Sequence, residues 1–325
     1  MSEGHTKERL KELQALPLDR KVGFTIARIV EWYQHYNGKV YVSFSGGKDS
    51  TVLLHIARGI FPEMKAMFLD TGLEYPEIRD FVKTYDNVDW VRPKMSFKQV
   101  IEKYGYPVIG KEIAQAVHEL RALFPCRLEQ FGFTPPQGKY GKRYDLSKYA
   151  YLRDAPFKID DRCCDVMKKS PANKYHRQTG LYPIIATMAS ESALRPTQWI
   201  KDGCNAFNNK HPKSSPMSFW TEQDVLRYIR TMNIPMASCY GEIVEVNGKL
   251  RTTKCSRTGC MFCMFGIRGD GNPNRFQRMY FTHHKQWKYC MDTLGIRKVM
   301  EFIGEPVEPD ADLFNYEILD QQKGN

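Results

Sequence analysis

Short β-branched and aromatic runs alternate with helical patterns over the first hundred residues. Such runs predict buried strands over residues 40–44, 64–70 and 88–91. Apolar positions at helical spacing predict helices over residues 22–36, 50–59, 76–85 and 97–104. Strands that alternate with helices are typical of a parallel sheet with helices on both faces. We therefore predict an α/β fold with a doubly wound parallel sheet, whose ligand lies at the carboxyl ends of the strands.

The pattern is less regular outside this region. A short helix is expected within residues 2–20, and further elements are a strand over 182–187 and helices over 113–124, 165–178, 221–231 and 287–291. Asn247-Gly248 within an alternating stretch predicts a β-hairpin over 242–252. Residues 132–148 are rich in Gly, Pro, Lys and Tyr, and we expect a mobile loop there.

Ser45-Gly46-Gly47-Lys48-Asp49-Ser50 lies between the first predicted strand and its helix. A helix N-terminus after a glycine-rich turn directs free backbone N–H groups and a positive dipole toward an anion. The two serines add hydroxyl donors and Lys48 adds a positive charge. An ordinary turn with a chance pair of glycines is the alternative, and the spacing differs from the Walker motif. The stretch predicts a phosphate site.

This hexapeptide resembles the pyrophosphatase loop (PP-loop) of the adenine-nucleotide α-hydrolase superfamily. The run Asp70-Thr71-Gly72-Leu73-Glu74-Tyr75-Pro76-Glu77 is similar to the phosphoadenosine phosphosulfate (PAPS) reductase family, and the resemblance extends from about residue 40 to about residue 304. It implies an adenine-nucleotide α-hydrolase-like fold that binds ATP or an adenylyl sulfate nucleotide, with Mg²⁺. The nucleotide-binding residues that it implies here are Ser45, Gly46, Gly47, Lys48, Asp49, Ser50, Asp70, Thr71 and Gly72.

A second part of the nucleotide site is implied after the strand predicted at 182–187. Ala189-Ser190-Glu191-Ser192-Ala193-Leu194-Arg195 resembles the E-S-x-x-R segment of the family. By this resemblance Glu191, Ser192 and Arg195 bind the nucleotide, and the catalytic residues are Lys48, Asp49 and Arg195. The alternative for Arg195 is a surface ion pair.

Four of the nine cysteines have ligand-like spacing: Cys163 and Cys164 in tandem, and Cys260 and Cys263 in a C-x-x-C turn. Adenylyl-sulfate reductases of the family carry such cysteines, so the resemblance implies a [4Fe–4S] cluster on these four. Zinc is the chemical rival, Cys255 is a spare ligand, and buried thiols that act as small hydrophobes are the alternative. We interpret the remaining four as structural: Cys126, Cys204, Cys239 and Cys290.

The sequence departs from the family in two places. Reductases of the family carry an arginine shortly before E-S-x-x-R, where this sequence has Thr187-Met188-Ala189. They also end in a Cys-Gly-[Ile/Leu]-His segment whose thiol attacks sulfur, whereas no cysteine follows Cys290. The nucleophile of a reductase is therefore not evident.

Positive charge is concentrated in two stretches of a chain whose formal net charge is +11. Residues 92–177 contain 18 Lys and Arg against 9 Asp and Glu, and residues 249–288 contain 9 against 1. Such stretches favour a polyanionic partner such as nucleic acid, although a nucleotide site or a solvated surface also uses such charge. Residues 301–325 form an acidic tail. The lack of an apolar membrane span or signal core predicts a cytoplasmic protein without a membrane partner.

Three hypotheses follow. The first is an ATP-dependent sulfur-transfer enzyme that adenylates nucleic acid and inserts sulfur, as in DNA phosphorothioation or tRNA thiolation, with a sulfur donor such as a cysteine desulfurase. The second is an iron–sulfur adenylyl-sulfate or PAPS reductase, and the third is a non-catalytic nucleotide-binding module of a defence complex. We expect an N-terminal helical segment (1–38), a PP-loop α/β domain (39–235) and a cysteine-bearing C-terminal segment (236–325).

Overall fold

The computed structural model describes residues 5–135, 145–192 and 194–308. Its internal contacts divide the chain into two compact units. Unit 1 consists of Met1–Pro93 with Lys168–Gly259, and unit 2 consists of Lys94–Met167 with Cys260–Asn325. The domain boundaries that we predicted at residues 38 and 235 do not coincide with this division and stay a prediction.

Unit 1 contains a six-stranded, mostly parallel sheet, which confirms the predicted fold class. The strand order is β3-β2-β1-β4-β6-β5, and only β5 pairs in the antiparallel sense. After β3 the chain crosses back over the sheet, and β4 then pairs with β1 on the side opposite β2. The strand β1 therefore lies between β2 and β4. The strands are β1 (Val40–Ser43), β2 (Ala66–Leu69), β3 (Val88–Val91), β4 (Tyr182–Ile184), β5 (Asn205–Ala206) and β6 (Lys213–Ser214).

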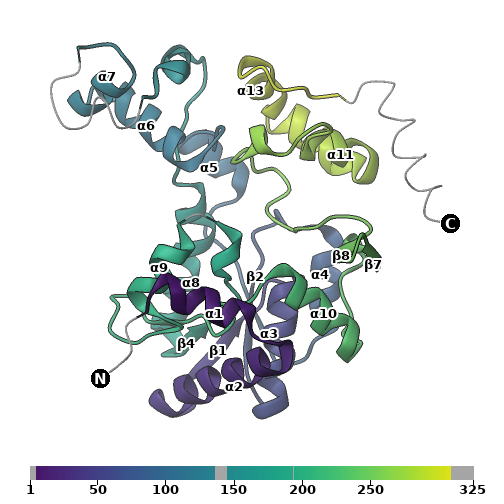
Figure 1. The fold of residues 1–325 in the computed structure, drawn as a ribbon. Coiled ribbons are helices and arrows are strands. Elements are labelled where there is room, and N and C mark those ends of the chain that lie inside the picture. The colour runs from purple at the N-terminus through teal and green to yellow at the C-terminus, as the bar shows by residue number, and fades with distance from the viewer. Residues whose placement is uncertain (1–4, 136–144, 193, 309–325) are drawn as a thin grey trace. The chain divides into compact units, whose positions relative to one another are not determined.

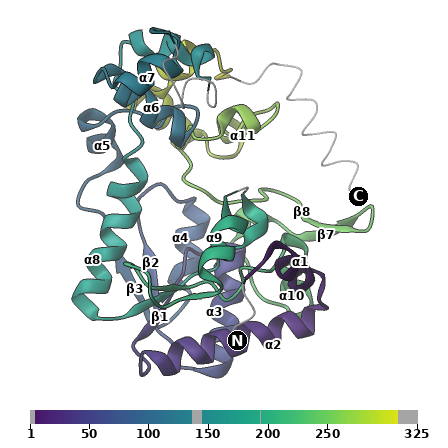
Figure 2. The same cartoon turned by 60° about the vertical axis from the view of Figure 1, so that its left-hand side comes forward.

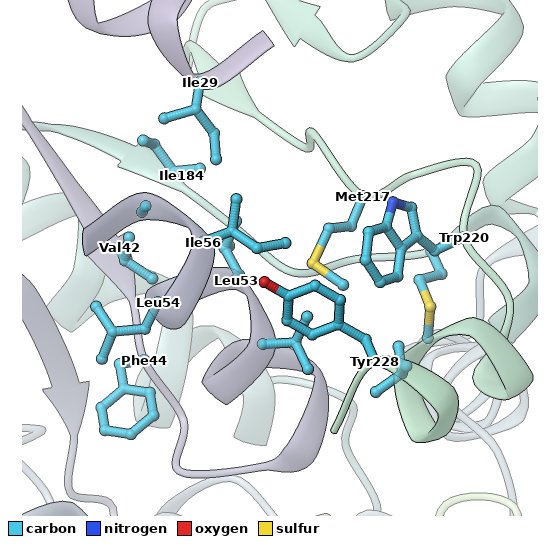
Figure 3. Close-up of a cluster of buried hydrophobic side chains, with 14 of the residues drawn as sticks. Ile29, Val42, Phe44, Leu53, Leu54, Ile56, Ile184, Met217, Trp220 and Tyr228 are labelled. Atoms are coloured by element: carbon cyan, nitrogen blue, oxygen red, sulfur yellow. The ribbon is translucent and has the colours of Figure 1, made fainter. Parts of the chain in front are cut away.

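Helices cover both faces of this sheet. Alternate residues of a strand point to opposite faces, so Val40, Val42 and Phe44 join the large core, while Tyr41 packs with Tyr175 of α8 on the other face. Figure 2 shows α8 on the opposite side of the strands from α3. Figure 3 shows part of the large core. The helices of unit 1, labelled in Figure 1, are α1 (Lys7–Ala15), α2 (Leu18–His35), α3 (Lys48–Ile60), α4 (Pro76–Lys83), α8 (Ser170–Thr179), α9 (Arg195–Asp202) and α10 (Glu222–Met232).

The predicted hairpin is present as β7 (Ile243–Val246) and β8 (Lys249–Thr252). Asn247 and Gly248 both have positive φ, as a two-residue hairpin turn requires. The helix predicted over 165–178 begins instead with a π-helical turn, Asp165–Lys169, before α8. The strand predicted over 182–187 ends at Ile184, because the chain leaves the sheet and forms a 3₁₀ turn, Ala189–Glu191.

Unit 2 is helical within the described residues. Arg121 joins the helix that it ends to residues 152–157. Its guanidinium donates to four backbone carbonyl oxygens of that segment. The backbone N–H of Gly266 donates to the carbonyl oxygen of Ile109 (2.7 Å), which joins the two parts of the unit. The helices are α5 (Phe97–Lys103), α6 (Lys111–Arg121), α7 (Pro125–Gln130), α11 (Arg275–Thr282), α12 (His284–Lys288) and α13 (Ile296–Phe302).

Unit 2 differs in part from two of the predictions. A 3₁₀ helix, Ser147–Asp154, begins where the predicted loop over 132–148 was expected to end. The centre of that loop, 136–144, and the acidic tail from 309 onward lie outside the described residues. The helix expected over 287–291 is continuous with α12 but takes a π-helical form over Tyr289–Thr293.

Candidate functional site

The segment 45–50 connects β1 to α3, as predicted, and Gly46 fixes its path. Gly46 has φ +70°, a conformation that favours glycine. A Cβ atom at this position would lie 2.7 Å from Cγ2 of Val82 and 2.9 Å from Cγ2 of Ile78, both on α4. The loop therefore packs so closely against α4 that a larger residue does not fit.

The two serines of the loop hold its shape. Ser50 Oγ donates to the carbonyl oxygen of Gly47 (2.9 Å) and accepts from the backbone N–H of Ser45 (3.1 Å). The Ser45 and Ser50 hydroxyl oxygens are 3.0 Å apart. Ser50 is buried and Ser45 is exposed, so Ser45 is the hydroxyl that a ligand can reach.

Lys48 is buried at the start of α3, with only 3% of its side chain exposed. Its Nζ lies 3.6 Å from Asp49 Oδ1 and 3.4 Å from Glu222 Oε1. Its backbone N–H donates to the Tyr240 hydroxyl (3.2 Å), which in turn lies 2.6 Å from Thr258 Oγ1. Sequence reasoning missed Glu222, Tyr240 and Thr258, because they reach the loop only through the fold.

Two arginines are electrostatic neighbours of Asp49. Burial raises the pKa of Asp49, and the charges of Lys48 and Arg257 oppose this shift. Burial lowers the pKa of Arg195, and the positive charge of Arg257 lowers it further, while Asp49 opposes the shift. The structure thus brings Lys48 and Asp49 together and places Arg195 within electrostatic range of Asp49, all within unit 1. It adds Arg257, which the sequence analysis counted only as part of a basic stretch.

Glu191 and Arg195 form an ion pair at the start of α9. Arg195 also donates to the carbonyl oxygen of Met188 (3.3 Å), and Glu191 Oε2 accepts from the backbone N–H of Met188 (2.8 Å). The ion pair that we considered as the alternative for Arg195 is therefore present. Ser192 is exposed. A role for these residues in nucleotide binding stays a prediction.

Asp70 lies directly after β2 and is buried, with 4% of its surface exposed. Its Oδ2 accepts from Arg79 Nη2 and from Arg92 Nε, each at 3.1 Å. Its Oδ1 is buried and has no hydrogen-bond partner among the described residues. Oδ1 is therefore the Asp70 atom that a ribose or Mg²⁺ ligand would satisfy.

Thr71 and Gly72 shape the turn after Asp70. Thr71 donates to the Glu74 carboxylate from its backbone N–H (3.0 Å) and from its hydroxyl (2.6 Å). Gly72 has φ +74°.

Elsewhere in unit 1 a pocket opens beyond the carboxyl end of β4, where open α/β sheets bind ligands. Its lining includes Thr187, Met188, Arg195, Gln198, Lys213 and Ser215.

The four predicted metal ligands all belong to unit 2. The backbone N–H of Cys263 donates to the carbonyl oxygen of Cys260 (3.2 Å), which closes the C-x-x-C turn. Burial raises the pKa of Cys263 to about 11, and Cys260 and Cys164 add smaller electrostatic contributions in the same direction. Three of the four thiols are thus electrostatic neighbours.

These thiols do not form a closed metal site in the structure. Over the described part of the chain, no group of three or more His, Cys, Asp or Glu side chains is arranged to hold a metal ion. Thiolate donors have the chemistry that an iron–sulfur cluster or zinc requires. The four cysteines therefore fit such a metal group by their chemistry, although their side chains are not arranged as a closed site. The spare ligand Cys255 belongs to unit 1, where its Sγ donates to the carbonyl oxygen of Cys239 (2.9 Å).

None of the helices in the described ranges has both the length and the apolar character that a membrane span needs. This finding agrees with the absence of a long apolar run in the sequence.

Comparison with known proteins identifies relatives over most of the chain. An adenosine 5′-phosphosulfate reductase of Staphylococcus epidermidis is 26% identical over 256 residues, which cover 77% of this chain and 80% of that protein. Subunit 2 of a sulfate adenylyltransferase of Pseudomonas putida is 25% identical over 220 residues, 64% of this chain and 62% of that protein. An uncharacterised protein of Methanocaldococcus jannaschii is 31% identical over 142 residues, 42% of this chain but only 30% of that protein.

The profile of the phosphoadenosine phosphosulfate reductase domain matches residues 39–125 and 139–266, which is more than half of the chain. The match includes the 45–50 loop, Asp70, Arg195 and the four candidate metal ligands. The named relatives that match over most of their length are enzymes. The chain therefore belongs to the phosphoadenosine phosphosulfate reductase domain family.

Proposed function

We propose that this protein binds an adenylyl sulfonucleotide at the 45–50 loop and reduces its sulfonyl group. The observation that carries the proposal is the buried Lys48, whose Nζ lies 3.6 Å from Asp49 Oδ1 at the N-terminus of α3, with Arg195 and Arg257 within electrostatic range of Asp49. Such a cluster suits a ligand with adjacent phosphate and sulfate groups. The matched relatives include adenosine 5′-phosphosulfate reductases, which supports this substrate class.

The proposed site residues divide by their chemistry. Lys48 pairs with Asp49 and Glu222 in the structure, and a bound phosphate would compete with these carboxylates for its Nζ. Reduction of the sulfonucleotide takes two electrons from two thiols, so that the nucleotide, sulfite and one disulfide are formed. As the sulfate–phosphate bond breaks, negative charge develops on the nucleotide phosphate. Lys48 and Arg195 would stabilise that charge, and Asp49 would hold them in place.

We also propose that Cys163, Cys164, Cys260 and Cys263 hold a [4Fe–4S] cluster. The support is the thiolate donor set, the closed C-x-x-C turn and the electrostatic proximity of three of these thiols. A cluster would supply a polarisable iron–sulfur group held by the four thiolates. The reduction proposed above does not depend on it.

The test is release of sulfite under anaerobic conditions. The protein is incubated with adenosine 5′-phosphosulfate or its 3′-phosphorylated form, with reduced thioredoxin or glutathione as the thiol. We expect sulfite in equal amounts with AMP from adenosine 5′-phosphosulfate, or with adenosine 3′,5′-bisphosphate from the 3′-phosphorylated form. This release should be strongly reduced in Lys48→Ala and unchanged in Lys83→Ala. Lys83 is a suitable control because it is exposed on α4 and pairs with Asp80. Turnover by Lys48→Ala at the rate of the unaltered protein would exclude the proposed site.

A second candidate function is ATP-dependent sulfur transfer to nucleic acid. The observation that favours it is Cys290, which is fully buried, and burial raises its pKa well above the usual value. The last cysteine of the described residues is therefore not placed to attack a bound sulfonucleotide. In this reaction an acceptor oxygen attacks ATP, pyrophosphate leaves, and sulfur from a donor such as a cysteine desulfurase displaces AMP.

Release of pyrophosphate from ATP, with DNA or tRNA present, distinguishes this second candidate. Nucleic acid gripped by the basic stretches 92–177 and 249–288 would lose affinity with salt, with a log–log slope of about −0.7 to −0.9 per phosphate contact. Pyrophosphate release together with that salt dependence would favour the second candidate. Sulfite release without nucleic-acid binding would favour the first, and nucleotide binding without either product would leave a non-catalytic module.

A further inference from the structure

Unit 1 contains a pair of thiols that the proposed function does not use. The backbone N–H of Cys255 donates to the carbonyl oxygen of Cys239 (3.2 Å), and the backbone N–H of Lys254 donates to that of Tyr240 (3.1 Å). The two chain segments therefore run side by side. Residues that face each other in a hydrogen-bonded antiparallel pair have Cα atoms about 5.5 Å apart, which lies within the range of about 4.4–6.8 Å that a disulfide spans.

The environments of the two thiols differ. Cys239 is buried, with 6% of its surface exposed, whereas Cys255 is half-buried. While Cys255 keeps its proton, its Sγ donates to the carbonyl oxygen of Cys239 (2.9 Å). When Cys255 ionises, a hydrogen bond from the Cys239 thiol lowers the pKa of Cys255 and raises that of Cys239.

Charged groups near the pair act differently on the two thiols. The Glu77 carboxylate disfavours ionisation of both thiols, whereas the positive charge of Lys48 favours the Cys255 thiolate. A more exposed thiol with a lowered pKa beside a buried thiol with a raised pKa is the arrangement of an attacking and a resolving cysteine.

We propose that Cys239 and Cys255 form a redox-active dithiol that exchanges with the disulfides of small thiols such as glutathione. The Cys255 thiolate attacks one sulfur of the external disulfide, forms a mixed disulfide and releases one small thiolate. The Cys239 thiol then loses its proton to solvent and attacks Cys255 Sγ, which forms the Cys239–Cys255 disulfide and releases the second small thiolate. The external disulfide gains two electrons, and the pair loses two.

The pair also lies next to the 45–50 loop. Tyr240, the residue after Cys239, contacts the backbone N–H of Lys48 and the Thr258 hydroxyl. Oxidation would remove the Cys255 thiolate from the surroundings of Lys48 and would tie the two segments that contact the loop. This inference does not depend on which reaction the loop supports.

The experiment equilibrates the full chain with reduced and oxidised glutathione at a series of ratios. The remaining free thiols are blocked, and the peptides are mapped by mass spectrometry. We expect one internal linkage, Cys239 to Cys255, to form while Cys126 stays reduced or carries only glutathione. Cys126 is an exposed cysteine of α7 and serves as the control thiol.

Two variants assign the roles within the pair. Cys239→Ala should accumulate glutathione on Cys255, because no resolving thiol is left. Cys255→Ser should leave Cys239 unmodified, because Cys239 is buried. The proposal is overturned if the unaltered protein accumulates glutathione on Cys255 without the internal linkage, or if Cys255 reacts no faster than Cys126 in both the unaltered protein and Cys239→Ala.

Discussion

At the residue scale, the loop at residues 45–50 depends on one glycine whose neighbours leave no room for a side chain. Gly46 has a positive φ, and a Cβ atom at this position would clash with the side chains of Val82 and Ile78. Gly46→Ala should therefore destabilise the protein by about 1–3 kcal/mol, the usual cost of such strain. Urea unfolding measures the change in the free energy of unfolding.

Gly59→Ala is the matched control for this prediction. Gly59 lies within α3, has φ in the ordinary negative range and has open space where a Cβ atom would lie. Alanine there should leave the stability unchanged or raise it by up to about 1 kcal/mol. Equal stability of the Gly46→Ala variant and the unaltered protein would contradict the packing described for the loop.

Asp49 gives a prediction about pH. Burial raises the pKa of Asp49 above its ordinary value of 3.8. The stability contributed by this group is therefore fully present below pH 3.8 and is lost as the pH rises through the raised pKa. Asp49→Asn cannot ionise, so its stability relative to the unaltered protein should increase over that interval and then become constant. Urea unfolding at a series of acidic pH values measures this difference.

Asp80→Asn is the control, because its stability difference from the unaltered protein should change with pH in the opposite sense. A hydrogen bond from Lys83 lowers the pKa of the exposed Asp80. The Asp80 carboxylate therefore contributes stability above pH 3.8 that is lost as the pH falls through the lowered pKa, and the variant lacks that contribution. A difference of the same sign for both variants would show that the pH dependence does not come from these carboxylates.

The partners of Lys48 show why a site is harder to predict than a motif. The hexapeptide and its flanking strand and helix are local features, so the sequence alone placed the loop correctly. Glu222 and Tyr240 lie more than 170 positions further along the chain and contact Lys48 only after folding. The role of Arg257 is similar, since nothing in the sequence distinguished it from its basic neighbours.

At the element scale, strongly periodic helices and β-branched strands were predicted within a few residues of their ends. The strands β5 and β6 have two residues each, which is too short for any periodicity to be visible. The helix α9 was missed because its eight residues include Pro196 and few apolar positions, although proline is common in the first turn of a helix. Chain topology rather than local pattern creates these elements.

A buried ion pair connects α2 to α10. Lys21 Nζ lies 2.6 Å from Asp224 Oδ2, and both side chains are almost fully buried. Asp224 also accepts from the backbone N–H and the hydroxyl of Thr221, which caps α10. Lys21→Ala would leave Asp224 buried without its charge partner. We expect a loss of about 3–5 kcal/mol in the free energy of unfolding, measured by urea titration.

Lys83→Ala removes an ion pair of similar length, Lys83 to Asp80 at 2.7 Å, that is exposed to solvent. Exposed pairs contribute about 0–1 kcal/mol, so this variant should remain close to the unaltered protein. A loss in Lys21→Ala no larger than that in Lys83→Ala would mean that the buried pair does not hold the two helices together.

At the scale of the whole molecule, each compact unit is built from two separate parts of the chain. Local sequence patterns cannot reveal such an arrangement, because the contacts that define a unit join distant segments. The division nevertheless places all four predicted metal ligands in unit 2 and the loop, Asp70 and Arg195 in unit 1.

The cluster is tested by metal analysis of protein prepared without oxygen. Four thiolates on a [4Fe–4S] cluster should give bound iron and sulfide with visible absorption, lost in Cys164→Ser and Cys263→Ser and retained in Cys126→Ser. Colourless protein with zinc in place of iron would favour the rival metal. Protein that binds neither metal would agree with the lack of a closed metal group among the described residues and would exclude the cluster.

The central claim is that the loop at Ser45–Ser50 binds an adenylyl sulfonucleotide through Lys48, and calorimetric titration tests it most directly. The titration compares adenosine 5′-phosphosulfate, its 3′-phosphorylated form and ATP on the unaltered protein, Lys48→Ala and Lys83→Ala. We predict that a sulfonucleotide binds the unaltered protein and Lys83→Ala equally, and that Lys48→Ala weakens binding by about 1.5–3 kcal/mol, roughly 10- to 150-fold. Equal affinity of all three proteins for every nucleotide would contradict the account.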